Sequence, residues 1–336
     1  MDQTVAHKIA GITNMAADIC GVPYSEIAGL SDTLLALPKP DENPVLGGRS
    51  GLNSDGTPLQ FCISSKKEGW AGRLIADPAS TYFIVEDRYL KSIDAIELLF
   101  ERSKSTELKP LFEEMVKFHL PESKSVKDYP DGVFWLGSPV QGSGIAIYMD
   151  GRRGGNEIGW NRLRDWLRMM MPEISGLDEW IDATGKVGDI MSIGFEGSSL
   201  KNVRAKIYWR LREVALLDSL NCEILKHQEF KDFLGELAGD KQLRLFGMVF
   251  SLGFHISSQQ FFDVKIDMCG CKDCLNYSSS EWVGKLKHFT EKYNIAPFPV
   301  SREMLEYNAA VSYFGFGMDV RQEKRLNLYL NSHGQI

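Results

Sequence analysis

The sequence predicts an α+β fold: a closed, ten-stranded antiparallel β-barrel of five αββα units, with the helices on the outside. A strand pattern, with a polar or aromatic residue at every second position, recurs five times at intervals of about 60 residues. Each of these segments follows another strand-like run across turn-forming residues, as the second strand of a β-hairpin does. Amphipathic helical stretches separate the hairpins.

The expected elements follow from these patterns along the chain. The recurrent segments are Arg73–Asp77, Gly144–Tyr148, Arg204–Tyr208, Asp263–Asp267 and Arg325–Tyr329. The runs before them are Pro58–Ser64, Val133–Gly137, Ile190–Gly197, Leu245–His255 and Tyr313–Val320. We expect helices over 87–118, 160–171, 210–236, 280–293 and 301–310. We expect one domain over 1–336, with an N-terminal helical segment over 1–45 and five hairpin–helix repeats over 46–336.

The direction of the strand side chains favours a closed barrel. Arg204, Lys206 and Tyr208 share one face of their strand, whereas Ala205 and Ile207 share the other. Helices can cover the apolar faces, and closure of the sheet gathers the polar faces into one lumen and removes the sheet edges. A parallel eight-stranded barrel fits less well because its strands are not hairpins. A two-layer α+β sandwich is the structural alternative.

Composition and charge restrict the function classes. The chain has 336 residues, of which 43% are hydrophobic and 25% charged, with a formal net charge of −7. This charge does not favour nucleic acid or an anionic membrane as a partner. We expect no membrane-spanning segment and no secretory signal. Six cysteines in so long a chain do not suggest a disulfide framework, so we expect a cytoplasmic protein.

Three motifs resemble the aromatic prenyltransferases of the ABBA, or PT-barrel, superfamily. The strand Arg204-x-Lys206-x-Tyr208 resembles the Arg-x-Lys-x-Tyr strand of that family. The segment from Ser50 to Gln60 is similar to the first-hairpin motif of its indole-prenylating, dimethylallyltryptophan synthase-like branch, and Arg73 with Asp77-Pro78 is similar to the next strand of that branch. The order of all five hairpins agrees, so the resemblance covers nearly the whole chain.

The resemblance implies a role for several residues on the inward faces of the strands. Basic residues at these positions bind the diphosphate of an allylic donor, and tyrosines shield the prenyl cation. The matching diphosphate-binding positions are Arg73, Arg204, Lys206, Lys265 and Arg325, and the matching shield positions are Tyr148, Tyr208 and Tyr329.

Three positions depart from the family pattern. Ala146 stands where the family usually has Lys, Asp267 stands where a shielding Tyr is common, and Gln60 stands where the indole branch has Glu. Gln60 can accept a hydrogen bond from an indole N–H but cannot take a proton at neutral pH. We therefore predict Gln60 and Glu196 as catalytic residues, with Glu196 as the proton acceptor and with His255 and Asp319 as weaker candidates.

Trp135 points inward in the expected register, so we place it in the acceptor pocket, although a packing role explains it equally well. The basic residues could instead pair with Glu196 or Asp263 across the sheet, which would give a satisfied polar lumen without a ligand.

The sequence does not demand a metal. It lacks the Asp-Asp-x-x-Asp pattern that binds magnesium in isoprenyl diphosphate synthases. We expect no required cofactor, although one Mg²⁺ bridging Asp267 or Asp77 to the diphosphate is compatible with the sequence. The run Cys269-x-Cys271-x-x-Cys274 offers three zinc ligands, with Cys222 or His255 as a fourth, but we favour an ordinary reduced loop.

These features predict an aromatic prenyltransferase that moves a dimethylallyl or geranyl group from its diphosphate to an electron-rich ring. An indole or Trp-like acceptor is favoured, either as a small molecule or as a side chain of a peptide. The alternative is a non-catalytic or repurposed PT-barrel that binds a small ligand or peptide, and a third reading is a zinc-stabilised interaction protein.

Overall fold

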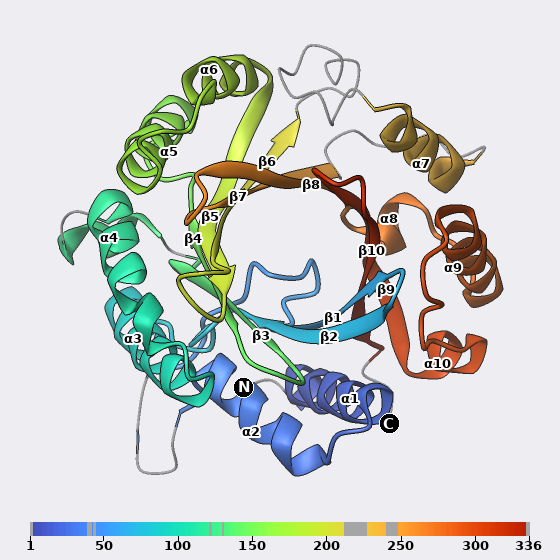
Figure 1. Ribbon diagram of the computed structural model, residues 1–336. Coiled ribbons are helices and arrows are strands. Elements are labelled where there is room, and N and C mark those ends of the chain that lie inside the picture. Colours follow the sequence, from blue (N-terminus) through green and yellow to red (C-terminus); the bar gives the residue numbers. More distant parts are fainter. Residues whose placement is uncertain are drawn as a thin grey trace.

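A closed antiparallel β-barrel forms the centre of the molecule. The computed structural model describes residues 3–38, 42, 45–120, 123–129, 131–211, 227–239 and 248–333. Each strand pairs with its neighbours in sequence, and the first strand closes the ring by pairing with the last. Helices surround the ring, as Figure 1 shows in a view along the barrel. The predicted ten-stranded barrel is therefore confirmed, and the two-layer sandwich is excluded.

The ten strands form the five predicted hairpins. Their bounds are β1 (Leu59–Lys66), β2 (Gly69–Ala76), β3 (Phe134–Pro139), β4 (Ile145–Asp150), β5 (Gly188–Gly197), β6 (Arg204–Leu211), β7 (Met248–His255), β8 (Gln260–Met268), β9 (Ala309–Asp319) and β10 (Lys324–Ser332). The first three residues of the predicted run Leu245–His255 lie outside the described residues.

The α-helices of the described residues lie between the hairpins and before the first one. They are α1 (Gln3–Cys20), α2 (Tyr24–Leu35), α3 (Val85–Arg102), α4 (Lys109–His119), α5 (Asn156–Met170), α6 (Leu177–Val187), α7 (Gln228–Ala238), α8 (Cys271–Cys274), α9 (Ser279–Tyr293) and α10 (Arg302–Tyr307). Short 3-10 turns span Thr106–Leu108 and Ser123–Asp128. None of these helices is long and apolar enough to cross a membrane.

Two helix predictions need correction. The helix expected over 87–118 is divided into α3 and α4, because Lys104 adopts a left-handed φ of 54° that a right-handed helix cannot continue through. The helix expected over 210–236 begins too early, because β6 extends to Leu211. Residues 212–226 of that prediction lie outside the described part of the chain. The sequence also did not predict α6.

The hydrophobic core lies between the outer face of the barrel and the helices. Ala205, Ile207 and Trp209 of β6 are fully buried there, as the alternation of the strand predicts. Aromatic side chains fill much of this layer: Phe233 of α7 lies 5.6 Å from Phe314 of β9, measured between ring centroids. The apolar residues therefore face outward, and the inward positions are left to polar side chains.

A buried ion pair stabilises one end of the barrel. Arg88 of α3 donates to Asp77 at 2.6 Å, and the two side chains are 3% and 1% exposed. The other oxygen of Asp77 accepts from the hydroxyl of Ser50 at 2.8 Å and from the N–H of Gly51. Arg88 also donates to the carbonyl of Asp131. The pair thus holds two loop segments whose residues Gly51 and Asp131 line the barrel opening.

This arrangement corrects one magnesium hypothesis. Asp77 does not face the lumen, because its carboxylate is enclosed by Arg88 and the Ser50 loop. It is therefore not placed to bridge a metal to a ligand in the barrel.

We predict that Asp77→Ala destabilises the fold by about 3–5 kcal/mol, because it leaves the Arg88 guanidinium buried without its counter-ion. Equilibrium unfolding in urea measures this change. Glu114→Ala is the matched control, because it breaks the exposed pair of Glu114 with Lys117 and should cost less than about 1 kcal/mol. Equal effects of the two substitutions would contradict the structural role of Asp77.

Candidate functional site

The lumen of the barrel contains a cavity with a volume of about 630 Å³. Residues from all ten strands line it, and on most strands they are alternate residues, as Gln60, Cys62, Ser64 and Lys66 are on β1. All residues that the sequence assigned to the site line this cavity: Gln60, Arg73, Trp135, Tyr148, Glu196, Arg204, Lys206, Tyr208, Lys265, Arg325 and Tyr329. Their shared location is thus observed, whereas the role of each stays a prediction.

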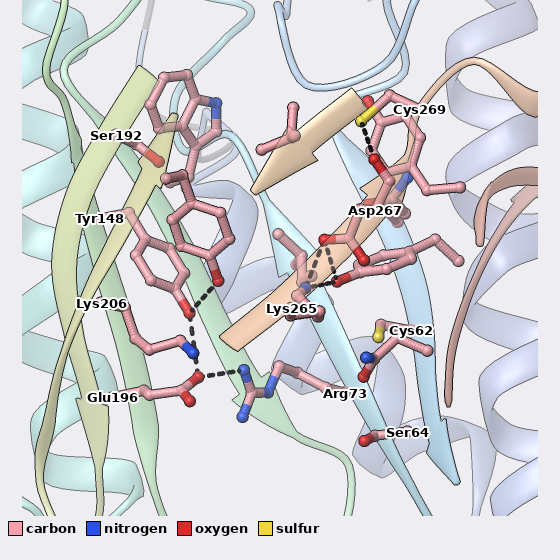
Figure 2. Close-up of a pocket in the computed structure, with 18 of the residues that line it drawn as sticks. Cys62, Ser64, Arg73, Tyr148, Ser192, Glu196, Lys206, Lys265, Asp267 and Cys269 are labelled. Atoms are coloured by element: carbon pink, nitrogen blue, oxygen red, sulfur yellow. Dashed lines mark hydrogen bonds and ion pairs between the residues drawn. The ribbon is translucent and has the colours of Figure 1, made fainter. Parts of the chain in front are cut away.

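Glu196 joins two of the basic residues. Arg73 of β2 donates to one of its oxygens at 2.8 Å, and Arg204 of β6 donates to the other. The hydroxyl of Tyr148 also donates to Glu196 at 3.1 Å. Figure 2 shows the contacts of Glu196 with Arg73 and Tyr148. Burial opposes the charged form of Glu196, but Arg204 and Arg73 hold its pKa well below the usual range. Glu196 is therefore an ionised but weak base in this state.

Asp263 is a second, fully buried carboxylate on the same side of the site. Lys206 donates to it at 2.8 Å, Arg325 lies 2.5 Å from it, and Arg204 lies 3.5 Å from it. Gly253 on the neighbouring strand leaves the space for this carboxylate, because a Cβ there would lie 2.0 Å from Asp263 Oδ1. The pairing of lumen cations with Glu196 and Asp263, which the sequence left open, is thus observed.

The charge of Lys206 depends on this neighbourhood. Its side chain is 2% exposed, and burial lowers its pKa to about 8, although Asp263 and Glu196 favour the charged form. Arg325, Lys206 and Arg204 hold the pKa of Asp263 far below its ordinary value, although burial raises it. Asp263 is therefore the residue that keeps Lys206 protonated near neutral pH.

The lumen still carries an excess of positive charge. Lys66 lines the cavity without an ion-pair partner among the described residues. The side chain of Lys66 reaches solvent, and partial desolvation and the nearby guanidinium groups of Arg325 and Arg204 lower its pKa. Three cations thus gather at one end of the lumen, where a multiply charged anion would be stabilised. Lys66 was not predicted for the site, although its alternation with Gln60 on β1 places it on the inward face.

Tyrosines occupy the middle of the lumen. The rings of Tyr148 and Tyr208 meet edge to face with centroids 5.3 Å apart, and those of Tyr313 and Tyr329 lie 5.5 Å apart. Burial raises the pKa of Tyr148, Tyr208 and Tyr329, so these phenols stay neutral at physiological pH. Tyr313 was not predicted for the site, although its alternation with the core residues Phe314 and Phe316 places it on the inward face of β9.

Gln60 is oriented at the other end of the cavity. Its amide nitrogen donates to Asn53 at 3.0 Å and to Ser312 at 2.8 Å. Both N–H groups are therefore used, and the carbonyl oxygen is the group that can accept a hydrogen bond from a ligand. Trp135 lines this part of the cavity and pairs in register with Tyr148.

The remaining candidates lie elsewhere. His255 packs against Phe262, and Asp319 accepts backbone hydrogen bonds within a turn, so neither lines the cavity. Among the described residues, no group of three or more His, Cys, Asp or Glu side chains could hold a metal ion. Cys269, Cys271 and Cys274 thus do not form such a site by themselves, and Cys222 lies outside the described residues.

Comparisons with known proteins support the fold. No protein-family model matches the chain, and no curated protein matches it significantly in sequence. Many solved structures are similar over nearly their whole length, and three of them are given below. The 5-dimethylallyltryptophan synthase from Streptomyces coelicolor has a TM-score of 0.77 at 14% identity, covering 98% of both chains. The 6-dimethylallyltryptophan synthase from Micromonospora olivasterospora, in complex with DMASPP and Trp, has a TM-score of 0.74 at 14% identity, again over 98% of both chains.

The third structure is AnaPT from Neosartorya fischeri, with a TM-score of 0.69 at 11% identity, covering 96% of this chain and 92% of that one. The chain therefore has the barrel fold of these prenyltransferases, as the sequence predicted.

We predict that Asp263→Asn destabilises the protein by about 3–5 kcal/mol at neutral pH, because Lys206 loses its buried counter-ion. Without Asp263 the pKa of folded Lys206 falls below the value of about 8 that it has in the unmodified protein. Between these two values the folded variant binds fewer protons than the folded unmodified protein, while the unfolded lysine of each stays protonated, so a rising pH stabilises the variant relative to the unmodified protein. The deficit should therefore shrink as the pH rises toward about 8 and then stay constant, because Lys206 is neutral in both folded proteins above that pH. Urea unfolding at several pH values measures it, and a deficit that does not change with pH would contradict this assignment.

Proposed function

We propose that the protein is an aromatic prenyltransferase that transfers a dimethylallyl or geranyl group from its diphosphate to an indole or another electron-rich ring. The observation that carries the proposal is the order of groups along the lumen. Cations gather at one end, tyrosine rings lie in the middle, and an oriented amide oxygen lies at the other end. Structures of the same fold whose names identify them as tryptophan prenylating enzymes support it.

The basic residues would stabilise the leaving group. As the allylic C–O bond breaks, its electron pair stays on diphosphate oxygen, and the negative charge that develops there needs fixed positive donors. Arg73, Arg204, Lys206 and Arg325 are already held close together by Glu196 and Asp263. Little reorganisation is then needed when the anion binds.

The tyrosines would protect the allylic cation. Their ring faces carry negative electrostatic potential, and one cation–π contact contributes about 0.5–2 kcal/mol. Tyr148 and Tyr329 are buried and Tyr208 is half-buried. Their rings therefore also exclude the water that would quench the cation.

The acceptor ring would lie between the tyrosines and Gln60. An indole N–H donating to the Gln60 carbonyl oxygen orients the ring, and a ring π pair then forms the new C–C bond. The resulting arenium ion is a strong acid, so even a weak base can take its proton. Glu196 becomes a stronger base once diphosphate shares the positive charge of Arg73 and Arg204, which keep their positions.

We propose further that the transfer needs no metal, because the lumen cations supply the positive charge that a magnesium ion would otherwise provide. Asp267, which the sequence considered as a magnesium ligand, is engaged by Lys265. The cysteines Cys20, Cys62, Cys269 and Cys271 form no disulfide within the described part of the chain, which supports our proposal of a reducing, cytoplasmic location.

Incubation with dimethylallyl diphosphate and tryptophan should add one prenyl group to the acceptor, which mass spectrometry detects, and the activity should persist in EDTA. Arg204→Ala should lower kcat/KM by about 10²-fold or more, because it removes a preorganised donor to the leaving group. Lys287→Ala, at an exposed site on α9, is the control with unchanged activity. Diphosphate binding without any prenyl transfer, to either tryptophan or tryptophan-containing peptides, would instead support the non-catalytic binding barrel.

Gln60→Leu should lower kcat/KM for an indole acceptor by about 10- to 100-fold, since one buried hydrogen bond to the ring is lost. The affinity for inorganic diphosphate should stay the same, because Gln60 lies away from the cations. Gln60→Glu keeps an acceptor oxygen and should retain most of the activity. Steady-state kinetics with indole and with an N-methylated indole separate the two effects, and equal loss on both acceptors would exclude the proposed N–H contact.

A further inference from the structure

Lys265 lies in a different environment from the other lumen cations. Its ammonium nitrogen is 2.5 Å from Asp267 and donates to the Tyr329 hydroxyl at 2.7 Å. It also lies 5.6 Å from the ring centroid of Tyr208 and 5.3 Å from that of Tyr329. Figure 2 shows Lys265 and Asp267 meeting across the cavity from the Glu196 and Arg73 contacts. A positive charge is thus held by two aromatic rings and one carboxylate.

This group of residues has the properties of a cation-binding cage. The side chains of Lys265 and Asp267 are only 6% and 7% exposed, so their attraction is weakly screened by water. Aromatic faces and a carboxylate both favour a positive charge placed between them. The cage is built without Lys265 itself: it consists of Tyr208, Tyr329 and Asp267, and the ammonium group is its occupant.

The backbone is arranged to keep Asp267 in this place. Gly315 of β9 lies directly opposite it, and a Cβ at Gly315 would be 2.0 Å from Asp267 Oδ1. That oxygen has no hydrogen-bond partner within the described part of the chain, although it is buried. The carboxylate therefore retains bonding capacity that Lys265 does not use.

The cage is also separate from the anion-binding end of the lumen. Arg73 and Arg204 are paired with Glu196, and Lys206 and Arg325 are paired with Asp263, whereas Lys265 is paired with Asp267. A flexible lysine stem allows the ammonium group to move, while the strand positions of Asp267 and the two tyrosines stay fixed.

We propose that Asp267, Tyr208 and Tyr329 form the site of the allylic cation, and that Lys265 occupies this site until a donor binds and then moves to the diphosphate. The inference rests on the proposed prenyl transfer and adds Asp267 to it as a catalytic residue. When the C–O bond breaks, its electron pair leaves with diphosphate and the positive charge develops on carbon beside the Asp267 carboxylate. Asp267 forms no bond to that carbon, and the π pair of the acceptor ring closes the new C–C bond.

The role assigned to Lys265 explains how one residue can serve two states. Before the donor arrives, the ammonium group neutralises Asp267 and prevents an unpaired buried carboxylate, which would be costly. After the donor arrives, the negative charge of diphosphate attracts the ammonium group and frees the cage. The binding of anion and cation in the lumen should therefore be cooperative.

Tetramethylammonium is a suitable probe, because it keeps its charge at every pH and cannot donate a hydrogen bond. Calorimetric titration should show that inorganic diphosphate strengthens the binding of tetramethylammonium to the unmodified protein by about tenfold or more. A tenfold change corresponds to a coupling free energy of about 1.4 kcal/mol. Lys265→Met empties the cage, so this variant should bind tetramethylammonium without diphosphate. Asp267→Asn should weaken tetramethylammonium binding by about tenfold or more, because the bound cation loses a desolvated charge partner.

Asp319→Asn is the matched control, because Asp319 is the last residue of β9 and lies outside the cavity, and an asparagine can also accept its backbone hydrogen bonds from the following turn. It should leave tetramethylammonium binding unchanged. Failure of Lys265→Met to gain cation binding would overturn the cage, even if Asp267→Asn folds poorly. Such a result would leave the proposed function standing if the unmodified protein still transfers prenyl groups, so the two failures are distinguishable.

Discussion

The pairing of buried carboxylates with basic side chains inside the barrel is the interaction on which the rest of the structure depends. A lumen lined by Arg73, Arg204, Lys206 and Arg325 alone would force like charges together in a space with little water. Glu196 and Asp263 lie between these cations and neutralise part of their charge. The barrel can therefore close around a polar interior, while its apolar faces pack against the helices.

The same pairing prepares the site for chemistry. Each carboxylate fixes the positions of several cations, so a bound anion meets donors that are already oriented. An anion must compete with Glu196 and Asp263 for these donors, which lowers its affinity but leaves the excess positive charge near Lys66 available. The carboxylates thus lower the affinity for an anion but keep the basic side chains in fixed positions.

Glycines on the inward face make this dense arrangement sterically feasible. Gly194 lies opposite Tyr148, Gly253 opposite Asp263, and Gly315 opposite Asp267. At each of these glycines a Cβ would lie closer than any real contact to a neighbouring oxygen. Large side chains and glycines therefore alternate around the ring, and the cavity remains open between them. Along the barrel axis, the basic residues, the tyrosines and Gln60 can then follow one another.

The sequence by itself determined the hairpins and the inward direction of Arg204, Lys206 and Tyr208, because strand alternation is a local property of the backbone. The repeat of about 60 residues also indicated that five such faces would meet in one lumen. Only the tertiary structure decided which charges pair, because Asp263 of β8 contacts Lys206 of β6 and Arg325 of β10, each two strands away in the barrel. It likewise turned Asp77 toward Arg88 of α3 and placed the ammonium of Lys265 over two tyrosine rings. Such contacts join residues far apart in the chain, and no local pattern encodes the closure that brings them together.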